Sequence, residues 1–179
     1  SARRTRDYFN DKAGEKSAID HLFHSLHGNR FLEEKIKSAI LDEDTIADTA
    51  SPELADIRRH MRQAQAKSRQ ILQKIISSPS YSKILQESLI TQRDGRFVVP
   101  VKAECKADMP GLIHDISSSG ATVFVEPMGV VQANNELIEL QGKEKKEIQR
   151  ILAQLSADAA AHKDDIGWDY DALVLLDCI

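Results

Sequence analysis

The spacing of apolar residues predicts two long helices. The first opens at Ser51-Pro52, where serine can cap free backbone N–H groups and proline fits the first helical turn. Apolar or small side chains then recur at intervals of three and four as far as Ser77: Leu54, Ile57, Met61, Ala64, Ser68, Ile71 and Ile75. Helical spacing returns over Met128–Lys163. Because each helix presents one long apolar stripe, we expect the two to pack together in antiparallel orientation.

Between these helices the period changes to that of β-strands. Leu89–Arg93 and Arg96–Val101 surround Asp94-Gly95, a dipeptide that favours positive φ at both positions of a two-residue turn. This pattern predicts a tight hairpin. Because Pro100 has no N–H, we expect its strand at a sheet edge or its end at a bulge.

A second strand pair is predicted at 111–116 and 121–126, joined by the Ser117–Gly120 loop. Together with the hairpin it makes a sheet of about four short strands. So small a sheet buries too little apolar surface to fold alone, so we expect it to pack against the helix ends.

The predicted fold is mainly α with a small antiparallel β subdomain, in which the two long helices are capped by the roughly four-stranded sheet. If Ser78 is level with Met128, residues 141–147 lie beside 59–65. Leu155 and Ala159 then need another cover, which an earlier apolar stripe could supply: Ile19, Leu22 and Leu26. The predicted segments are 1–50, helical and packed at the helix base; 51–79, the first long helix; 80–127, the sheet; 128–163, the second long helix; and 164–179, the start of a helix that continues in a larger protein.

Composition limits the functions that the chain can have. It contains 24 Lys and Arg against 28 Asp and Glu, a net charge of −4, so any nucleic-acid binding must be local. Residues 52–78 carry a local charge of +4, and residues 156–179 a local charge of −5. Apolar runs reach five residues, as at Ala172–Leu176, whereas a membrane helix needs about 20, so we expect a soluble protein. Two distant cysteines, Cys105 and Cys178, favour free thiols and a cytoplasmic location.

The first candidate site is a pair of arginines beside the hairpin turn. Arg93 and Arg96 flank Asp94-Gly95 and are expected to face each other on opposite strands. Like charges in this position are unfavourable unless they are neutralised, so the pair is either a phosphate site or a hydrated pair at a loop tip. Lys102 and Lys106 add two cations to the same region.

The second candidate site is the basic surface of the first long helix, represented by Arg58, Arg62 and Arg69. Cations in such a row can follow a phosphate backbone and release its counterions. Alternatively, they form a solvated face that pairs with glutamates of the second helix: Glu136, Glu139, Glu144 and Glu147.

We predict no catalytic, cofactor or metal site within the chain. Gly142-Lys143 lacks the glycine-rich loop of a nucleotide site. The Ser117–Gly120 loop lacks a nucleophile elbow and is interpreted as a turn. Three histidines on neighbouring turns could bring at most two ligands to a metal: His21, His24 and His27.

Three ordered segments, 89–104, 110–127 and 134–137, resemble the second bacterial paralogue family of the MutS mismatch-repair ATPases, also called endonuclease MutS type two. Ala50–Leu54 fits the same family. The resemblance implies that the chain contains the lever and clamp region with part of the helical core: one lever helix rises, a small β clamp lies at its end, and a second lever returns.

The same resemblance implies a function. Complete members of the family are homodimeric ATPases that use ATP and Mg²⁺ and typically carry a nuclease domain, and they are associated with DNA binding, suppression of recombination and rescue of collided ribosomes. This chain would be a non-catalytic module that engages DNA, RNA or a ribosome independently of sequence. The nucleic-acid-facing residues are inferred from charge and position alone: Arg93, Arg96, Lys102, Lys106, Arg58, Arg62 and Arg69.

An alternative hypothesis belongs to a different functional class. The stripe from Leu54 to Ile75 could pair between two chains as a structural coiled-coil dimerisation arm that has no contact with nucleic acid.

Overall fold

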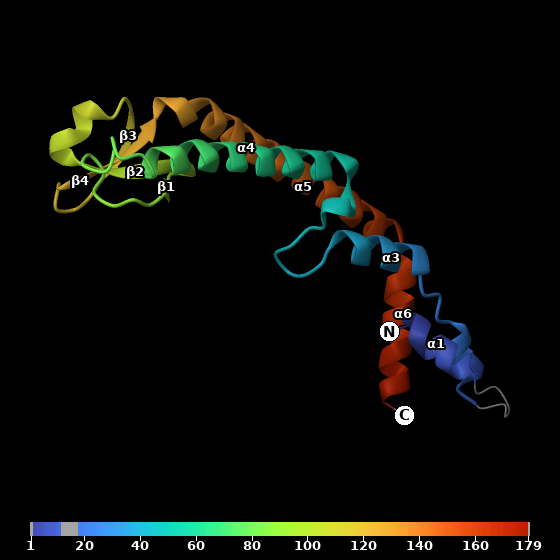
Figure 1. Ribbon diagram of the computed structural model, residues 1–179. Helices are drawn as coiled ribbons and strands as arrows, with labels where there is room; N and C mark the ends of the chain where they lie inside the picture. Colours follow the sequence, from blue (N-terminus) through green and yellow to red (C-terminus); the bar gives the residue numbers. More distant parts are fainter. Residues whose placement is uncertain (1, 12–17, 179) are drawn as a thin grey trace. The chain divides into compact units, whose positions relative to one another are not determined.

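The computed structural model describes residues 2–11 and 18–178 (Figure 1). Its elements are α1 (Ala2–Asp11), α2 (Asp20–His24), α3 (Arg30–Ala39), η1 (Asp48–Ala50), α4 (Pro52–Ile76), β1 (Thr91–Arg93), β2 (Arg96–Lys102), η2 (Ala103–Asp108), β3 (Gly111–Ile116), β4 (Thr122–Pro127), α5 (Met128–Ala161) and α6 (Lys163–Asp177). The prediction of a mainly α fold with a small four-stranded antiparallel sheet is confirmed. Among these residues, no helix is both long and apolar enough to cross a membrane.

The chain divides into two compact units. The sheet unit comprises residues 52–147, and the helical unit comprises the described residues up to 51 together with those from 148 onward. Helix α5 begins in the sheet unit and ends in the helical unit.

The strands of the sheet unit lie in the order β1-β2-β4-β3, with each neighbouring pair antiparallel. The hairpin prediction is correct: Asp94 and Gly95 form the turn, with φ of 49° and 76°. Thr91, Gln92 and Arg93 pair with Val98, Phe97 and Arg96. The predicted second pair is also present, as β3 and β4.

The predicted position of Pro100 is wrong. Its strand, β2, lies inside the sheet between β1 and β4, and its pairing with β4 over residues 99–102 has no bulge. The Pro100 carbonyl accepts a hydrogen bond of 2.9 Å from the Gln86 N–H, so its nitrogen faces the same side, where β1 has not yet begun. The missing N–H therefore leaves no strand partner unpaired.

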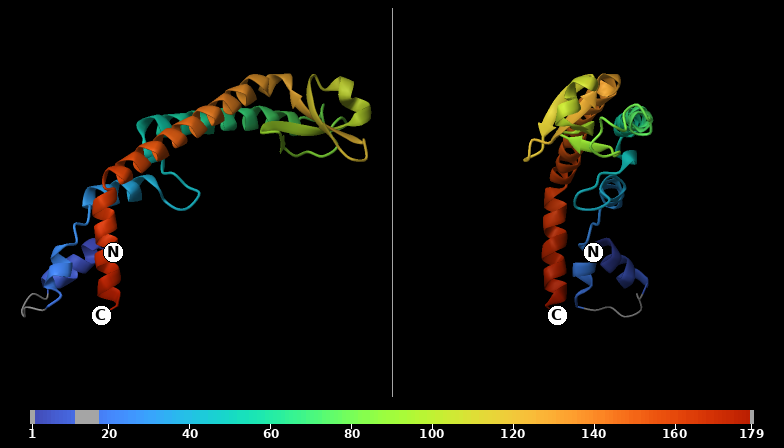
Figure 2. Two further views of the ribbon diagram at one scale, coloured as in Figure 1. Left: turned by 180° about the vertical axis from the view of Figure 1, so that it is seen from behind. Right: turned by 60° about the vertical axis from the view of Figure 1, so that its left-hand side comes forward.

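Helix α4 and the first part of α5 lie side by side in the sheet unit, as the views of Figures 1 and 2 show. Their contacts run in opposite directions: Ser68 Oγ lies 3.4 Å from Asn134 Oδ1, and Arg58 Nε lies 2.6 Å from Glu144 Oε1. Along α4, the residues that contact α5 are displaced by about one helical turn from the predicted partners. The reason is that the last turn of α4 extends beyond the start of α5, where Ile75 and Ile76 pack against the sheet core.

The core of the sheet unit lies between one face of the sheet and the two helices. Strand residues such as Val99 and Val125 meet Leu72 of α4 and Leu137 of α5 there, all of them 0% or 1% exposed. The predicted stripe of α4 faces this interior, since all seven of its residues are buried or half-buried: Leu54, Ile57, Met61, Ala64, Ser68, Ile71 and Ile75. Leu72 completes the buried face but was missing from the predicted stripe.

In the helical unit, α3 and η1 cover Ile151 and Leu155, because Ala39 and Ala50 line a small cavity with them. The expected cover, the stripe of Ile19, Leu22 and Leu26, lies elsewhere: α2 packs against α1 and α6. Lys35 of α3 also bonds to Asp158 at 2.5 Å. The long helical pattern of residues 128–163 is interrupted at His162, which has φ −108° and ψ 20° and separates α5 from α6.

A carboxylate between two cations links α1 to α3. Glu33 accepts hydrogen bonds from Arg3 at 3.1 Å and from Lys37 at 2.5 Å, and these lower the pKa of Glu33 from 4.5 to about 2. Because the folded pKa is depressed, the stabilisation is complete above about pH 4.5 and is lost as the pH falls toward 2.

We therefore expect the Glu33 carboxyl carbon to titrate near pH 2 in an NMR titration. Arg3→Ala should raise this midpoint more than Lys37→Ala, because the Arg3 hydrogen bond is the largest cause of the shift. An unchanged midpoint in Arg3→Ala would contradict the contact between α1 and α3.

Candidate nucleic-acid interface

The two arginines of the hairpin face each other, as predicted, because Arg93 is paired with Arg96 across the turn. Each nevertheless has its own carboxylate partner. Arg93 Nε donates to Asp115 Oδ2 at 3.0 Å, and its guanidinium lies 4.0 Å from the ring centre of Phe124. Arg93 thus extends from β1 across β2 and β4 to β3 on one face of the sheet. A phosphate between the two guanidinium groups is not needed to neutralise them.

Arg96 is bound to a buried carboxylate. Its Nη1 lies 2.9 Å and 3.0 Å from the two oxygens of Glu126, which is 0% exposed, and its Nη2 donates to Asn135 Oδ1 at 2.7 Å. His114 Nε2 lies 2.5 Å from Glu126 Oε2, and Asn134 Nδ2 donates to Glu126 Oε1 at 2.7 Å. Glu126 is therefore the centre of a network that joins β2, β3, β4 and α5.

Asn134 extends this network to the backbone of the sheet. Its side chain donates to the Phe97 carbonyl at 3.0 Å and accepts from the Phe97 N–H at 3.4 Å, so it pairs with β2 as a strand residue would. Ser68 of α4 lies 3.4 Å from the same side chain. Through this network, which we call the Glu126 network, the sheet is held to both helices.

Gly111 permits the close approach of β3 to this network. A Cβ at this position would lie 2.2 Å from the Glu126 carbonyl oxygen, closer than side-chain carbons come to backbone atoms. The three segments that carry the family resemblance thus meet at one place. Glu126, His114 and Asn134 were not predicted as site residues, because residues distant in the sequence showed no shared spacing.

The candidate cations of α4 have different environments. Arg58 is bound to Glu144 of α5, which agrees with the alternative that the basic face pairs with the second helix. Arg62 is exposed on the same helix. Arg69 is also exposed, and its guanidinium lies 5.6 Å from the ring centre of Phe97. Within the described residues, no carboxylate lies within ion-pair distance of Arg69.

The lysine candidates lie at the end of β2 and just beyond it. Lys102 donates from Nζ to the Lys83 carbonyl at 3.0 Å. Lys106 is exposed in η2, where the described part of the chain offers it no ion-pair partner. The structure therefore brings Arg93 and Arg96 together but leaves the other candidates separate along the unit.

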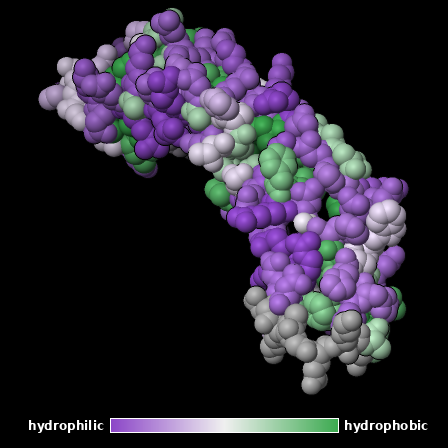
Figure 3. All heavy atoms as spheres, turned by 90° about the vertical axis from the view of Figure 1, so that its right-hand side faces the viewer, coloured by the Kyte–Doolittle hydropathy of each residue, from purple (hydrophilic) through white to green (hydrophobic). Residues whose placement is uncertain are grey.

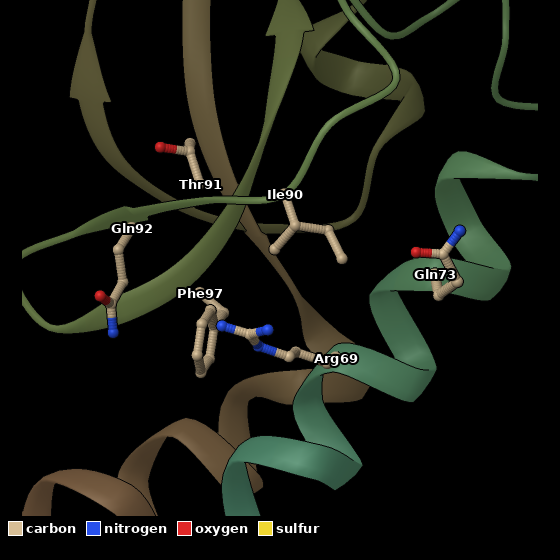
Figure 4. A pocket seen from close by; sticks show the side chains of 6 residues that line it. All are labelled: Arg69, Gln73, Ile90, Thr91, Gln92 and Phe97. Carbon is tan, nitrogen blue, oxygen red and sulfur yellow. The ribbon is translucent and has the colours of Figure 1, made fainter.

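A groove lies between α4 and β1, with a volume of about 360 Å³ (Figure 4). Arg69 and Gln73 line it from the helix, and Gln92 and Thr91 from the strand. Ile90 and Phe97 supply its apolar lining. Figure 4 shows the Arg69 guanidinium in front of the Phe97 ring. The groove combines one cation and two amides beside an aromatic ring.

The charge of the chain differs between its two units. Residues 52–147 contain 14 Lys and Arg and 12 Asp and Glu, a net charge of +2, whereas the remaining residues contain 10 and 16, a net charge of −6. On the face drawn in Figure 3, most residues are hydrophilic and the hydrophobic ones are interspersed among them. Of the two units, only the sheet unit has a net positive charge.

No group of three or more potential metal ligands is present among the described residues. Of the three histidines considered above, His21 has its Nδ1 3.0 Å from the Ala18 carbonyl. The backbone N–H groups of His27 and Gly28 donate to the Asp169 carboxylate. The Ser117–Gly120 loop is a turn in which Gly120 has φ 72° and its N–H donates to the Ser117 carbonyl at 2.8 Å.

Comparison with known proteins identifies close relatives. The chain is 50% identical over 179 residues to an endonuclease MutS2 of Pelotomaculum thermopropionicum and 48% identical over 181 residues to one of Ruminiclostridium cellulolyticum. Each match covers 100% of this chain and 23% of the relative. An endonuclease MutS2 of Acetivibrio thermocellus is 45% identical over 94% of this chain and 21% of its own length. The chain therefore spans less than a quarter of the length of these relatives. A comparison with models of protein families found no match.

Proposed function

Because the chain belongs to the MutS2 family, we propose that it is the lever and clamp segment of such a protein and engages nucleic acid without reading sequence. In this proposal α4 and α5 are the levers and the sheet is the clamp. The segment itself does no chemistry; ATP, Mg²⁺ and any nuclease activity belong to other parts of a homodimeric full-length protein. DNA, RNA and the RNA of a ribosome share the phosphate backbone that the segment would contact.

The observation that carries the proposal is the charge of the sheet unit. Its net charge is +2 in a chain of net charge −4, and several of its exposed cations have no carboxylate partner among the described residues. They include Lys67, Arg69, Lys74 and Lys106. Cations that are not neutralised internally can release counterions from a phosphate backbone. Arg93, Arg96 and Arg58 contribute less, because each is bound to a carboxylate.

The lever role is supported by the Glu126 network. Buried hydrogen bonds join Phe97 and Glu126 of the sheet to Asn134 of α5, and Ser68 of α4 bonds to the same side chain. They resist sliding of the sheet against the helices, since separation would take the Asn134 donor away from a buried carboxylate. A displacement of the helices would therefore move the sheet with them. The alternative of a dimerisation arm has less support, because Leu54 and Ile57 are 0% and 7% exposed within a single chain.

We expect the chain to bind both duplex and single-stranded oligonucleotides with an affinity that falls as salt rises. Lys67→Ala and Lys74→Ala should each reduce the slope of log affinity against log salt by about 1, because each removes one phosphate contact. Fluorescence anisotropy at several salt concentrations measures this slope.

Lys163→Ala is the matched control, because it removes the same charge from an exposed position in the acidic helical unit. It should leave the slope unchanged. An affinity that does not depend on salt, or equal effects of all three replacements, would contradict the proposal.

A further inference from the structure

We propose that the groove between α4 and β1 binds an unpaired nucleotide of a single-stranded nucleic acid, with the base stacked on the Arg69 guanidinium. This inference rests on the proposed function, which it makes more specific. It adds a site that recognises exposed bases to a surface that otherwise contacts phosphates.

The groove has the size and lining of a small-molecule site. Its volume of about 360 Å³ falls within the range of roughly 300–1,000 Å³ that is typical of ligand pockets. Phe97 is 6% exposed, so its ring is a fixed inner wall, and Ile90 continues the apolar surface (Figure 4). Thr91 and Gln92 are held by the pairing of β1 with β2.

Arg69 supplies the stacking surface. Its guanidinium lies 5.6 Å from the ring centre of Phe97. A planar guanidinium stacks on aromatic rings, and single-stranded nucleic acids are bound by bases that stack on such planes. With Phe97 on one side of the guanidinium, the other side can receive a base. The positive charge also attracts the phosphate that is attached to that base.

The charge of Arg69 is available, unlike that of the hairpin arginines. Another groove of this unit contains Arg93 above Phe124, but there Asp115 already neutralises the cation. Arg69 has no such partner among the described residues. The groove beside α4 is therefore the one where an arginine that lies over an aromatic ring keeps its attraction for an anion.

The polar groups of the groove suit the edge of a base. Gln73 lies on α4 one turn beyond Arg69, and Gln92 lies on β1. Each amide offers both a donor and an acceptor. Because these groups can bond to the edge of any base, we expect little preference for sequence.

The site favours single strands because of what it contacts. In a duplex, both faces of each base are covered by neighbouring bases, and the pairing edges are occupied. A base can reach the guanidinium only if it is unstacked and unpaired. Duplex nucleic acid would therefore bind the sheet unit through phosphates alone.

The test compares three variants of the full chain on three probes by fluorescence anisotropy. The probes are a 12-nucleotide single strand, a duplex of the same length, and a 12-residue strand with abasic sugars throughout. Arg69→Ala should weaken binding of the single strand by about 10-fold, since stacking on one side chain is worth about that factor. It should weaken binding of the duplex and the abasic strand by no more than about 3-fold.

Lys74→Ala is the matched control, because it removes a charge from the same helix outside the groove. It should reduce the affinity for all three probes by the same small factor. Arg69→Lys keeps the positive charge but lacks the planar guanidinium. It should therefore weaken binding of the single strand as much as Arg69→Ala does. Circular dichroism establishes that each variant is folded.

The outcomes separate the two proposals. If Arg69→Ala weakens all three probes equally, or if only the duplex binds, the base site is wrong and the phosphate-binding function stands. If the unchanged chain binds none of the probes, the proposed function is wrong as well. A loss confined to the strand that carries bases supports the site.

Discussion

Glu126→Ala is expected to destabilise the sheet unit by about 3–5 kcal/mol, the usual effect of removing one partner of a buried ion pair. Glu126 is 0% exposed and accepts hydrogen bonds from Arg96 and Asn134, while His114 Nε2 lies 2.5 Å away. Its loss would remove the acceptor of Arg96 Nη1 and one of the two acceptors of Asn134 Nδ2, so the guanidinium would keep Asn135 as its remaining acceptor. Urea unfolding followed by circular dichroism measures the change in the free energy of unfolding.

Amide hydrogen exchange would locate the effect. We expect faster exchange in β2 and β4, because the network joins these strands to α5, and little change in the helical unit. Glu104→Ala is the matched control: it removes an exposed carboxylate from η2 in the same unit and should change stability by less than about 0.5 kcal/mol. Equal effects of the two replacements would show that the Glu126 network does not stabilise the unit.

Leu72→Ala is expected to cost about 2–5 kcal/mol, because it removes a side chain that is 0% exposed at the centre of the core between sheet and helices. Ile71→Ala is the natural comparison. Ile71 is the neighbouring residue and belongs to the apolar stripe predicted from spacing, but it is only half-buried. The same urea unfolding should therefore show a smaller loss for Ile71→Ala.

This pair of variants also distinguishes packing of the α4 stripe within one chain from pairing of the stripe between two chains. If Ile71 were a position in a coiled coil between two chains, Ile71→Ala would shift a dimer toward monomers and would cost more than Leu72→Ala. Sedimentation of both variants would reveal such a shift. A larger loss for Ile71→Ala would contradict the packing within a single chain that is described here.

Local patterns in the sequence predicted the elements well. Asp94-Gly95 specified the hairpin because few other dipeptides adopt positive φ at both turn positions. Ser51-Pro52 marked the start of α4 within one residue, and the regular apolar spacing predicted a helix as far as Ser77, one residue beyond its observed end at Ile76. These predictions succeeded because each depends on residues within a few positions of one another.

Predictions that depended on distant residues were less accurate. Pro100 was expected at a sheet edge or a bulge, but β2 lies inside the sheet. The proline is accommodated there because β1 pairs with β2 only as far as Val98 and does not reach it. Leu155 is covered by α3 and η1, whereas the predicted stripe of α2 packs against other helices. In both cases the local sequence pattern did not determine which element packs against which.

The candidate site shows the same division. By itself, the sequence determined which residues are charged, where the turn lies and that Arg93 and Arg96 face each other, because composition and short-range geometry decide these. Only the tertiary structure decided which charges are neutralised. Asp115 and Glu126 lie 22 and 30 residues away from the arginines that they bind, and Phe97 meets Arg69 only after the sheet packs on α4. Electrostatic partners depend on distances in space, and packing alone sets those distances.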